Sequence, residues 1–128
     1  MTFNQHTYAA DVLRAVGGKN IFSNRRRRYP LASDLGKAQE QDPGEADTRY
    51  PRVTLEEIRD AAPSVILLPD EPFNFTETHR QEICQLLAGT PAVQNGRVHL
   101  VDGSLITWHG TRLARAILEL PSLFAWPA

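Results

Sequence analysis

The sequence predicts an α/β fold, a single lobe with helices layered around a small, mainly parallel sheet. Segments with helical periodicity alternate with short apolar runs along the chain, which is the pattern of such folds. Two of these runs, Val65–Leu68 and Val98–Val101, have the length and the apolar character of parallel strands covered on both faces. With 128 residues, of which 41% are hydrophobic, the chain can build one core, so we expect one domain spanning residues 1–128.

The first helix is predicted before the pair Gly17-Gly18, which stops it. Its apolar face is formed by four residues at helical spacing, Ala9, Val12, Leu13 and Val16. The short apolar pair Ile21-Phe22 then predicts a strand stub.

Residues Arg25 to Arg49 are predicted to form a polar loop inserted in the lobe, because Gly36 and the pair Pro43-Gly44 interrupt a stretch with little apolar content. The arginine run Arg25–Arg28 could grip a polyanion, but the segment soon turns acidic, and the interpretation we favour is a solvated loop. We expect limited proteolysis to cut this segment first. The overall net charge of −1 gives no electrostatic footprint for nucleic acid.

The second helix is predicted to begin at Thr54, because Thr54 and Glu57 have the spacing of a capping box. It ends before Pro63. The apolar run Val65–Leu68 then predicts a buried strand that stops at Pro69.

A third helix, one further strand and a last helix complete the predicted order. The third helix presents three apolar residues, Ile83, Leu86 and Leu87. The segment Gly89–Pro91 breaks it, and the turn Asn95-Gly96 leads into the strand Val98–Val101. The last helix stops by Pro121 and buries three residues at helical spacing, Leu113, Ile117 and Leu120.

Ligands of open parallel sheets bind beyond the carboxyl ends of the strands, and both predicted strands lead there into aromatic and charged residues. The candidate ligand-binding residues are Tyr50, Phe73, Phe75, Trp108, His109 and Arg112. Aromatic residues with few polar partners suit a large flat ligand better than proton transfer. Taken individually, Phe73, Phe75 and Trp108 fit packing in the core better than ligand contact, because large aromatic residues dominate cores. His109 is expected to donate a hydrogen bond, with axial metal ligation as the alternative.

Several classes of function find no support in the residues. The chain has no glycine-rich phosphate loop, no serine elbow and no pairing of a nucleophile with a base, so we expect a protein that is not an enzyme and needs no cofactor. Its four histidines lack metal-ligand spacing, which predicts no metal site. The single cysteine, Cys84, excludes an internal disulfide. No apolar stretch is long enough for a membrane span, and the first residues do not form a secretory signal, so the chain as written is expected to be cytoplasmic or a fragment.

Four segments in order carry a resemblance to a known family: TYAADVLRAVGGKNIF, RYPRVTLEEI, PSVILLPDEPFNF and AVQNGRVHLVDGSLITWHGTRLARAI. Together they resemble the C-terminal lobe of the class III, helical-backbone periplasmic substrate-binding proteins of ABC importers, which capture cobalamin, haem and ferric siderophores. The resemblance implies a Rossmann-like, three-layer lobe. It also implies a non-catalytic substrate-binding (receptor) function, with a corrinoid, haem or ferric chelate held between this lobe and a first lobe.

Position by position, the resemblance places a ligand-stacking aromatic at Tyr50 and a permease-docking carboxylate at Glu56, for which a contribution to the helix dipole is the alternative. Cleft residues at the start of the last helix fall on Trp108, His109 and Arg112. The implied partners are an ABC permease and a first lobe, and the implied location is the periplasm or the cell surface. As an alternative function, a stand-alone lobe would act as a homodimerising interaction protein that captures no ligand.

Overall fold

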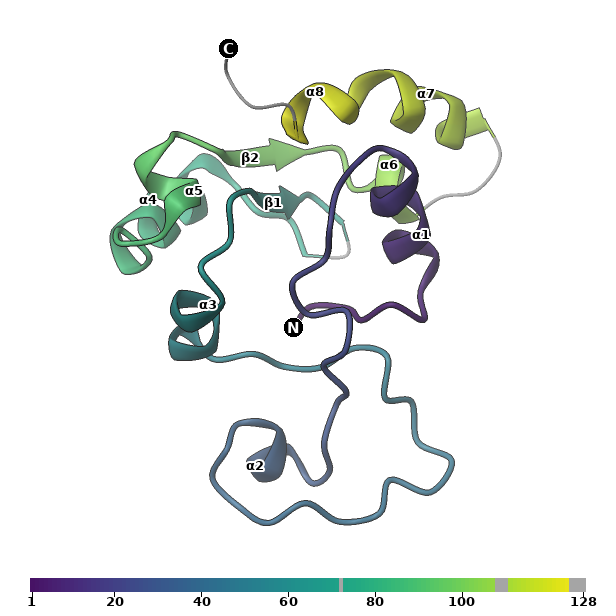
Figure 1. The fold of residues 1–128 in the computed structure, drawn as a ribbon, viewed down its shortest axis with the longest axis vertical. Helices are drawn as coiled ribbons and strands as arrows, with labels where there is room; N and C mark the ends of the chain where they lie inside the picture. The colour runs from purple at the N-terminus through teal and green to yellow at the C-terminus, as the bar shows by residue number, and fades with distance from the viewer. Residues whose placement is uncertain (72, 108–110, 125–128) are drawn as a thin grey trace.

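The computed structural model describes residues 1–71, 73–107 and 111–124, and Figure 1 shows their arrangement. In chain order the elements are α1 (Tyr8–Ala15), α2 (Leu31–Asp34), α3 (Leu55–Ala61), β1 (Ile66–Pro69), α4 (Glu77–Leu86), α5 (Pro91–Gln94), β2 (Val98–Val101), α6 (Ser104–Thr107), α7 (Thr111–Glu119) and α8 (Pro121–Phe124). Helices and a small parallel sheet together make a mixed α/β fold, as the sequence predicts.

The sheet of the described residues consists of β1 and β2, which run parallel with Ile66 opposite Val98. That the two apolar runs share a sheet is therefore confirmed. The strand β1 does not stop before Pro69 but includes it. The backbone N–H of Asp70 donates to Val101 of β2, and that of Ile66 donates to Arg97, the residue just before β2. Pro69 lies at an alternate position that faces away from β2, so it needs no N–H group.

The two faces of the sheet contribute to two different apolar clusters. On one face, Leu67 and Val101 pack against a cluster that joins α1 to α6, α7 and the residue after α7, formed by Ala9, Val12, Val16, Leu105, Ile106, Ala116 and Leu120. On the other face, Leu68 and Val98 are themselves core residues and join Ala92 of α5. Because side chains alternate along a strand, each strand helps to build both clusters.

Helix α1 confirms the first predicted helix, and Thr7 caps it by accepting a hydrogen bond from the backbone N–H of Ala10 at 3.1 Å. The predicted strand stub at Ile21-Phe22 is wrong, because these residues form a turn. The side chain of Asn20 explains the difference: its Oδ1 accepts from the N–H of Phe22 at 2.9 Å and so closes the turn locally.

Helix α3 begins after Thr54, whose hydroxyl accepts from the N–H of Glu57 at 3.1 Å, so half of the predicted capping box is present. The carboxylate of Glu57 does not complete the box, since it accepts from Arg25 at 3.1 Å instead. At the other end of the chain, Pro121 starts the short helix α8, and Ile117 is 52% exposed rather than buried. Among the helices described, none has the length and apolar character that crossing a membrane requires.

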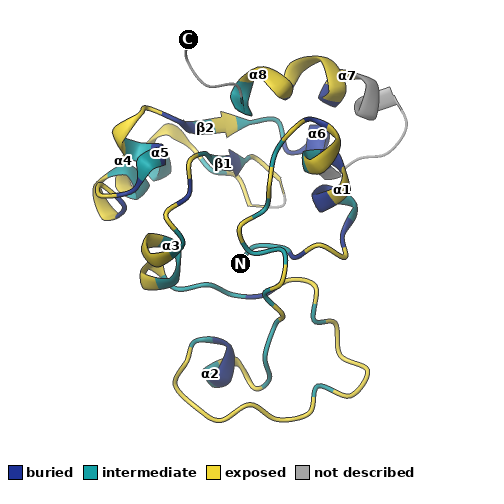
Figure 2. Cartoon of the chain, viewed as in Figure 1, coloured by how far each residue is buried: buried dark blue, intermediate teal, exposed yellow. Residues whose placement is uncertain are grey.

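We call residues 25–49 the arm, which extends away from the sheet at the bottom of Figure 1. Most of the arm is exposed, but α2 contributes the buried residues Ser33 and Asp34 (Figure 2). The two ends of the arm lie side by side, because the N–H of Arg27 donates to the carbonyl of Thr48 at 2.9 Å. The arm is thus polar, as expected, and it is also anchored by a buried residue that sequence reasoning did not single out.

Candidate functional site

The loops that follow β1 and β2 are bonded to each other. The carboxylate of Asp70 accepts from the backbone N–H of Gly103 at 2.8 Å, and the N–H of Asp70 donates to the carbonyl of Val101 at 3.2 Å. A Cβ atom at Gly103 would lie 2.9 Å from backbone atoms of Glu71, so only glycine permits this approach. We call the described residues of these loops, 70, 71, 73–75 and 102–104, the rim.

The second rim loop is closed by Asp102, whose Oδ1 accepts from the N–H of Ser104 at 2.9 Å and from its hydroxyl at 2.6 Å. Its other carboxylate oxygen lies 3.7 Å from a guanidinium nitrogen of Arg115. The carboxylates of Asp70 and Asp102 thus hold the rim together. This arrangement fits a rigid binding surface better than a site for proton transfer.

Three rings gather where the first rim loop meets α4. The rings of Phe73 and Phe75 pack edge to face with centroids 4.8 Å apart, and the ring of His79 lies 5.2 Å from Phe73 and 5.9 Å from Phe75. We call these residues the aromatic cluster. Phe75 packs against the core around Leu68, whereas Phe73 is 55% exposed. Phe75 is thus partly buried by the core, and Phe73 offers its ring to solvent.

His79 is a rim neighbour that sequence reasoning missed, and its hydrogen bond defines what its ring can do. The backbone N–H of Thr76 donates to Nδ1 of His79 at 3.0 Å as part of a capping box. Because Nδ1 accepts, the neutral ring carries its proton on Nε2. His79 therefore presents a hydrogen-bond donor beside the two phenylalanines. The signal was in the sequence: Thr76 and His79 have capping-box spacing, with histidine in the place of the usual Glu or Gln.

Of the other predicted site residues, Tyr50 and Glu56 are described in full. Tyr50 is exposed and stacks with its neighbour Arg49, whose guanidinium carbon lies 5.4 Å from the ring centroid. Glu56 is exposed in the first turn of α3, where both permease docking and a helix-dipole contribution stay predictions. Trp108 and His109 lie outside the described residues, and Arg112 is described only as part of the α7 backbone.

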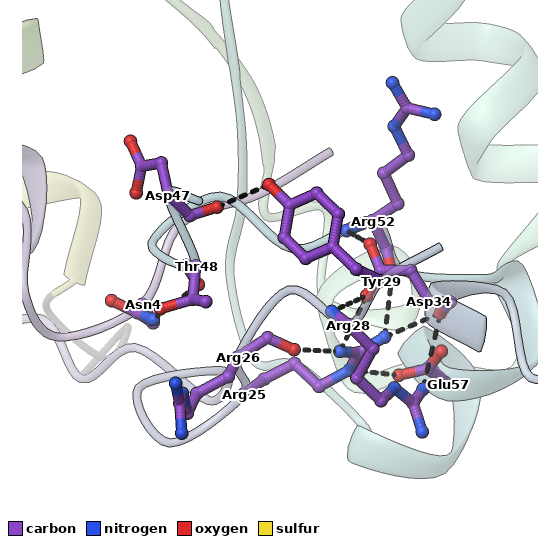
Figure 3. Close-up of polar contacts among 10 residues, drawn as sticks. All are labelled: Asn4, Arg25, Arg26, Arg28, Tyr29, Asp34, Asp47, Thr48, Arg52 and Glu57. Carbon is purple, nitrogen blue, oxygen red and sulfur yellow. Dashed lines mark hydrogen bonds and ion pairs between the residues drawn. The ribbon is translucent and has the colours of Figure 1, made fainter. Parts of the chain in front are cut away.

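A buried carboxylate fixes the chain next to Tyr50. Asp34 accepts from the N–H of Arg52 at 2.7 Å, from the N–H of Arg28 at 3.0 Å and from the guanidinium of Arg25 at 2.9 Å (Figure 3). Arg25 also forms an ion pair with Glu57, so its guanidinium joins Asp34 of the arm to α3. The first arginine of the run is accordingly bound and only 15% exposed, not solvated as expected.

The charges of Asp34 and Arg25 stabilise each other in this buried cluster. Burial by itself would raise the pKa of the Asp34 carboxyl, but the hydrogen bonds from Arg28, Arg52 and Arg25 outweigh burial and hold the pKa below its usual value. Burial by itself would lower the pKa of Arg25, but its hydrogen bonds to Glu57 and Asp34 and the charges of these two carboxylates outweigh burial and raise it. Both groups are therefore charged at neutral pH.

In the part of the chain that the structure describes, no three His, Cys, Asp or Glu side chains are arranged to hold a metal ion. Comparison with known proteins adds no relative: no family model, no curated protein and no solved structure matches the chain.

Proposed function

We propose that the chain is a non-catalytic binding lobe that holds a flat metal chelate, of the cobalamin, haem or ferric siderophore class, against its rim. The observation that carries this proposal is the aromatic cluster beyond the carboxyl end of β1, in which an exposed phenylalanine ring lies beside a histidine N–H donor. In parallel sheets this edge is where ligands bind.

The chemistry of the cluster suits ring stacking with one directed polar contact. An aromatic pair contributes about 0.5–1.5 kcal/mol beyond the area it buries, so Phe73 alone supplies part of the affinity. The Nε2–H group of His79 would donate to a carboxylate, amide or hydroxamate oxygen at the edge of the ligand. The carboxylates of Asp70 and Asp102 are engaged in holding the loops, which supports binding rather than catalysis.

The assembly that we propose follows the family resemblance. A three-layer lobe would cover one face of the ligand, and a first lobe or a second copy of this chain would cover the other. Glu56, exposed on α3, would dock onto an ABC permease. Tyr50, Trp108, His109 and Arg112 remain proposed ligand contacts.

The test is titration of haemin and of cobalamin, followed by absorbance and by fluorescence quenching. Because a single lobe covers one face of its ligand, we expect a dissociation constant no better than roughly micromolar. Phe73→Ala should weaken binding about tenfold, the equivalent of about 1.4 kcal/mol. Leu118→Ala is the matched control, since Leu118 is apolar, 82% exposed on α7 and part of neither rim loop.

Equal loss in the two variants would mean that the chelates adhere to any exposed apolar side chain, and the proposed site would be wrong. Trp108→Ala extends the same test to the sequence-derived part of the site. No binding by the wild type would contradict the proposal as a whole.

The second candidate function, a homodimerising interaction protein, is favoured by exposed apolar residues outside the rim. Ile117 and Leu118 of α7 are 52% and 82% exposed, and Leu100 of β2 is 42% exposed. Sedimentation equilibrium separates the two functions: a stable dimer that Leu118→Arg dissociates, together with no chelate binding, would support this candidate.

A further inference from the structure

A cavity of about 290 Å³ lies beside the end of α1, on elements that do not include the rim. It is lined by Gln5, Ala10, Arg14, Gly18, Lys19, Asn20 and Ser23. Water occupies roughly 30 Å³ per molecule in the liquid, so the cavity has room for an ion of several heavy atoms with part of its hydration shell.

The charged groups in the lining are all cationic. Arg14 and Lys19 are the charged lining residues, and no carboxylate lines the cavity. Arg14 pairs with the carboxylate of Asp11, but the contact is long, at 3.4 Å, and both side chains are about two-thirds exposed. Such an exposed pair is weak, so the guanidinium retains most of its capacity to bind another anion.

The lining also offers hydrogen-bond donors that have no partner among the described residues. Within the described residues, the side chains of Gln5, Lys19 and Ser23 have no hydrogen bond or ion pair. An amide, an ammonium and a hydroxyl group are thus available to donate into the same space. These groups match the acceptor-only surface of an oxyanion.

The backbone that carries these donors is fixed by contacts that leave the donors available. Asn20 donates from Nδ2 to the carbonyl of Phe3 at 2.8 Å and accepts on Oδ1 from the N–H of Phe22 at 2.9 Å, so its side chain braces the loop. The N–H of Gln5 donates to the carbonyl of Ser23 at 3.0 Å and joins the two walls. A preorganised site loses less entropy when it binds.

The end of α1 would repel an anion if its carbonyl groups faced the cavity without partners. Backbone N–H groups of Val16, Gly17 and Gly18 instead occupy the carbonyls of Val12, Arg14 and Leu13. This capping reduces the negative end of the helix dipole at the site. The two side-chain cations therefore dominate the local field.

We propose that this cavity binds a small oxyanion, such as a phosphate group, with Arg14 and Lys19 supplying charge and Ser23 and Gln5 supplying directed hydrogen bonds. The same charges disfavour a metal cation. The site is separate from the rim, so its ligand is additional to the proposed chelate and either site can be present without the other.

The experiment is a titration of the full chain with inorganic phosphate at constant ionic strength, followed by amide chemical shifts in ¹H–¹⁵N spectra and by calorimetry. We expect saturable shifts at Lys19, Asn20 and Ser23, with a dissociation constant on the order of 1 mM. Lys19→Gln should weaken binding about tenfold, and Ser23→Ala should weaken it by a smaller factor. Lys37→Gln is the matched control, because it removes the same charge from an exposed position in the arm.

Each outcome decides the proposal. Saturable shifts in the wild type that Lys19→Gln weakens and Lys37→Gln does not would support it, and equal affinity for sulfate would extend the class to tetrahedral oxyanions in general. Equal weakening by the two lysine variants would indicate diffuse attraction and overturn the site. Shifts that do not saturate, or saturable shifts elsewhere in the chain, would also overturn it. Unfolding curves of the variants, superimposable with the wild type, exclude a folding defect.

Discussion

Replacing Asp34 by Asn removes one charge and one acceptor oxygen from the buried cluster that anchors the arm. The carboxylate is fully buried and receives three donors, two from backbone N–H groups and one from Arg25. An asparagine amide has one carbonyl oxygen and one NH₂ group. At least one of the three donors must then face the NH₂ group, which is itself a donor. Arg25 still forms its ion pair with Glu57.

The magnitude follows from these contacts. Breaking a buried ion pair by removing one partner costs about 3–5 kcal/mol, and a single hydrogen bond to a charged group contributes about 1.5–3 kcal/mol. Since Arg25 retains its ion pair with Glu57 at 3.1 Å, the lower end of the range for a broken buried ion pair applies. We therefore expect Asp34→Asn to lower the free energy of unfolding by about 3 kcal/mol. At a urea m-value of about 2 kcal/mol/M, the midpoint should fall by about 1.5 M.

Urea unfolding followed by circular dichroism measures this loss, and limited proteolysis reports whether the arm detaches first. Asp47→Asn is the matched control, because Asp47 is an exposed arm carboxylate that pairs with Arg49. We expect its midpoint to match the wild type. If Asp34→Asn and Asp47→Asn have the same midpoint and the same cleavage rate in the arm, the reasoning about the buried cluster is refuted.

Three further predictions concern the rim, acid stability and the core. Gly103→Ala should lower the free energy of unfolding by about 1–3 kcal/mol, because the new Cβ would collide with Glu71. Gly89→Ala is the control and should not lower it, because a Cβ there meets open space. Equal unfolding midpoints of the two variants would contradict the close approach of Gly103 to Glu71. The pKa of Asp34 is lower in the folded chain than in the unfolded chain, so its carboxylate stabilises the fold above about pH 4, near the unfolded value. This contribution is lost as the pH falls through the folded-state pKa. The urea midpoints of the wild type and of Asp34→Asn should therefore converge in acid. Leu120→Ala, at a position 1% exposed, should cost about 2–5 kcal/mol by thermal or urea unfolding, and a cost below that of an exposed leucine would place Leu120 outside the core.

The mixed α/β fold was predictable because its signals are local. Two apolar runs and the alternation of helices around them were sufficient to expect a parallel sheet, and Thr54 was sufficient to place the start of α3. Ile21-Phe22 was mistaken for a strand because apolar character alone does not reveal that Asn20 closes a turn there. A side chain that bonds its own backbone competes with a strand, and this competition is visible only in the structure.

The candidate site was predictable only in part, because its decisive contacts join residues distant in sequence. Phe73 and Phe75 were expected at the carboxyl end of β1, but their meeting with His79 depends on how α4 leaves the loop. Asp34 offered no signal, since nothing in a polar segment distinguishes the one carboxylate that neighbouring N–H groups will surround. Long-range satisfaction of buried polar groups is a property of the folded chain rather than of any short segment.

The hydrogen bonds that join the two ends of the arm, which we call the clasp, determine where the chain can accept an insertion. Because Arg27 bonds to Thr48 and Arg25 bonds to Arg52, the ends of the arm stay together whatever length of chain connects them. The entropy of closing a loop grows only logarithmically with its length, so lengthening the tip around Gly44 costs little once the clasp is kept. The arm is accordingly a place where the chain can accept an inserted peptide or a reporter domain while the sheet and its helices keep their fold.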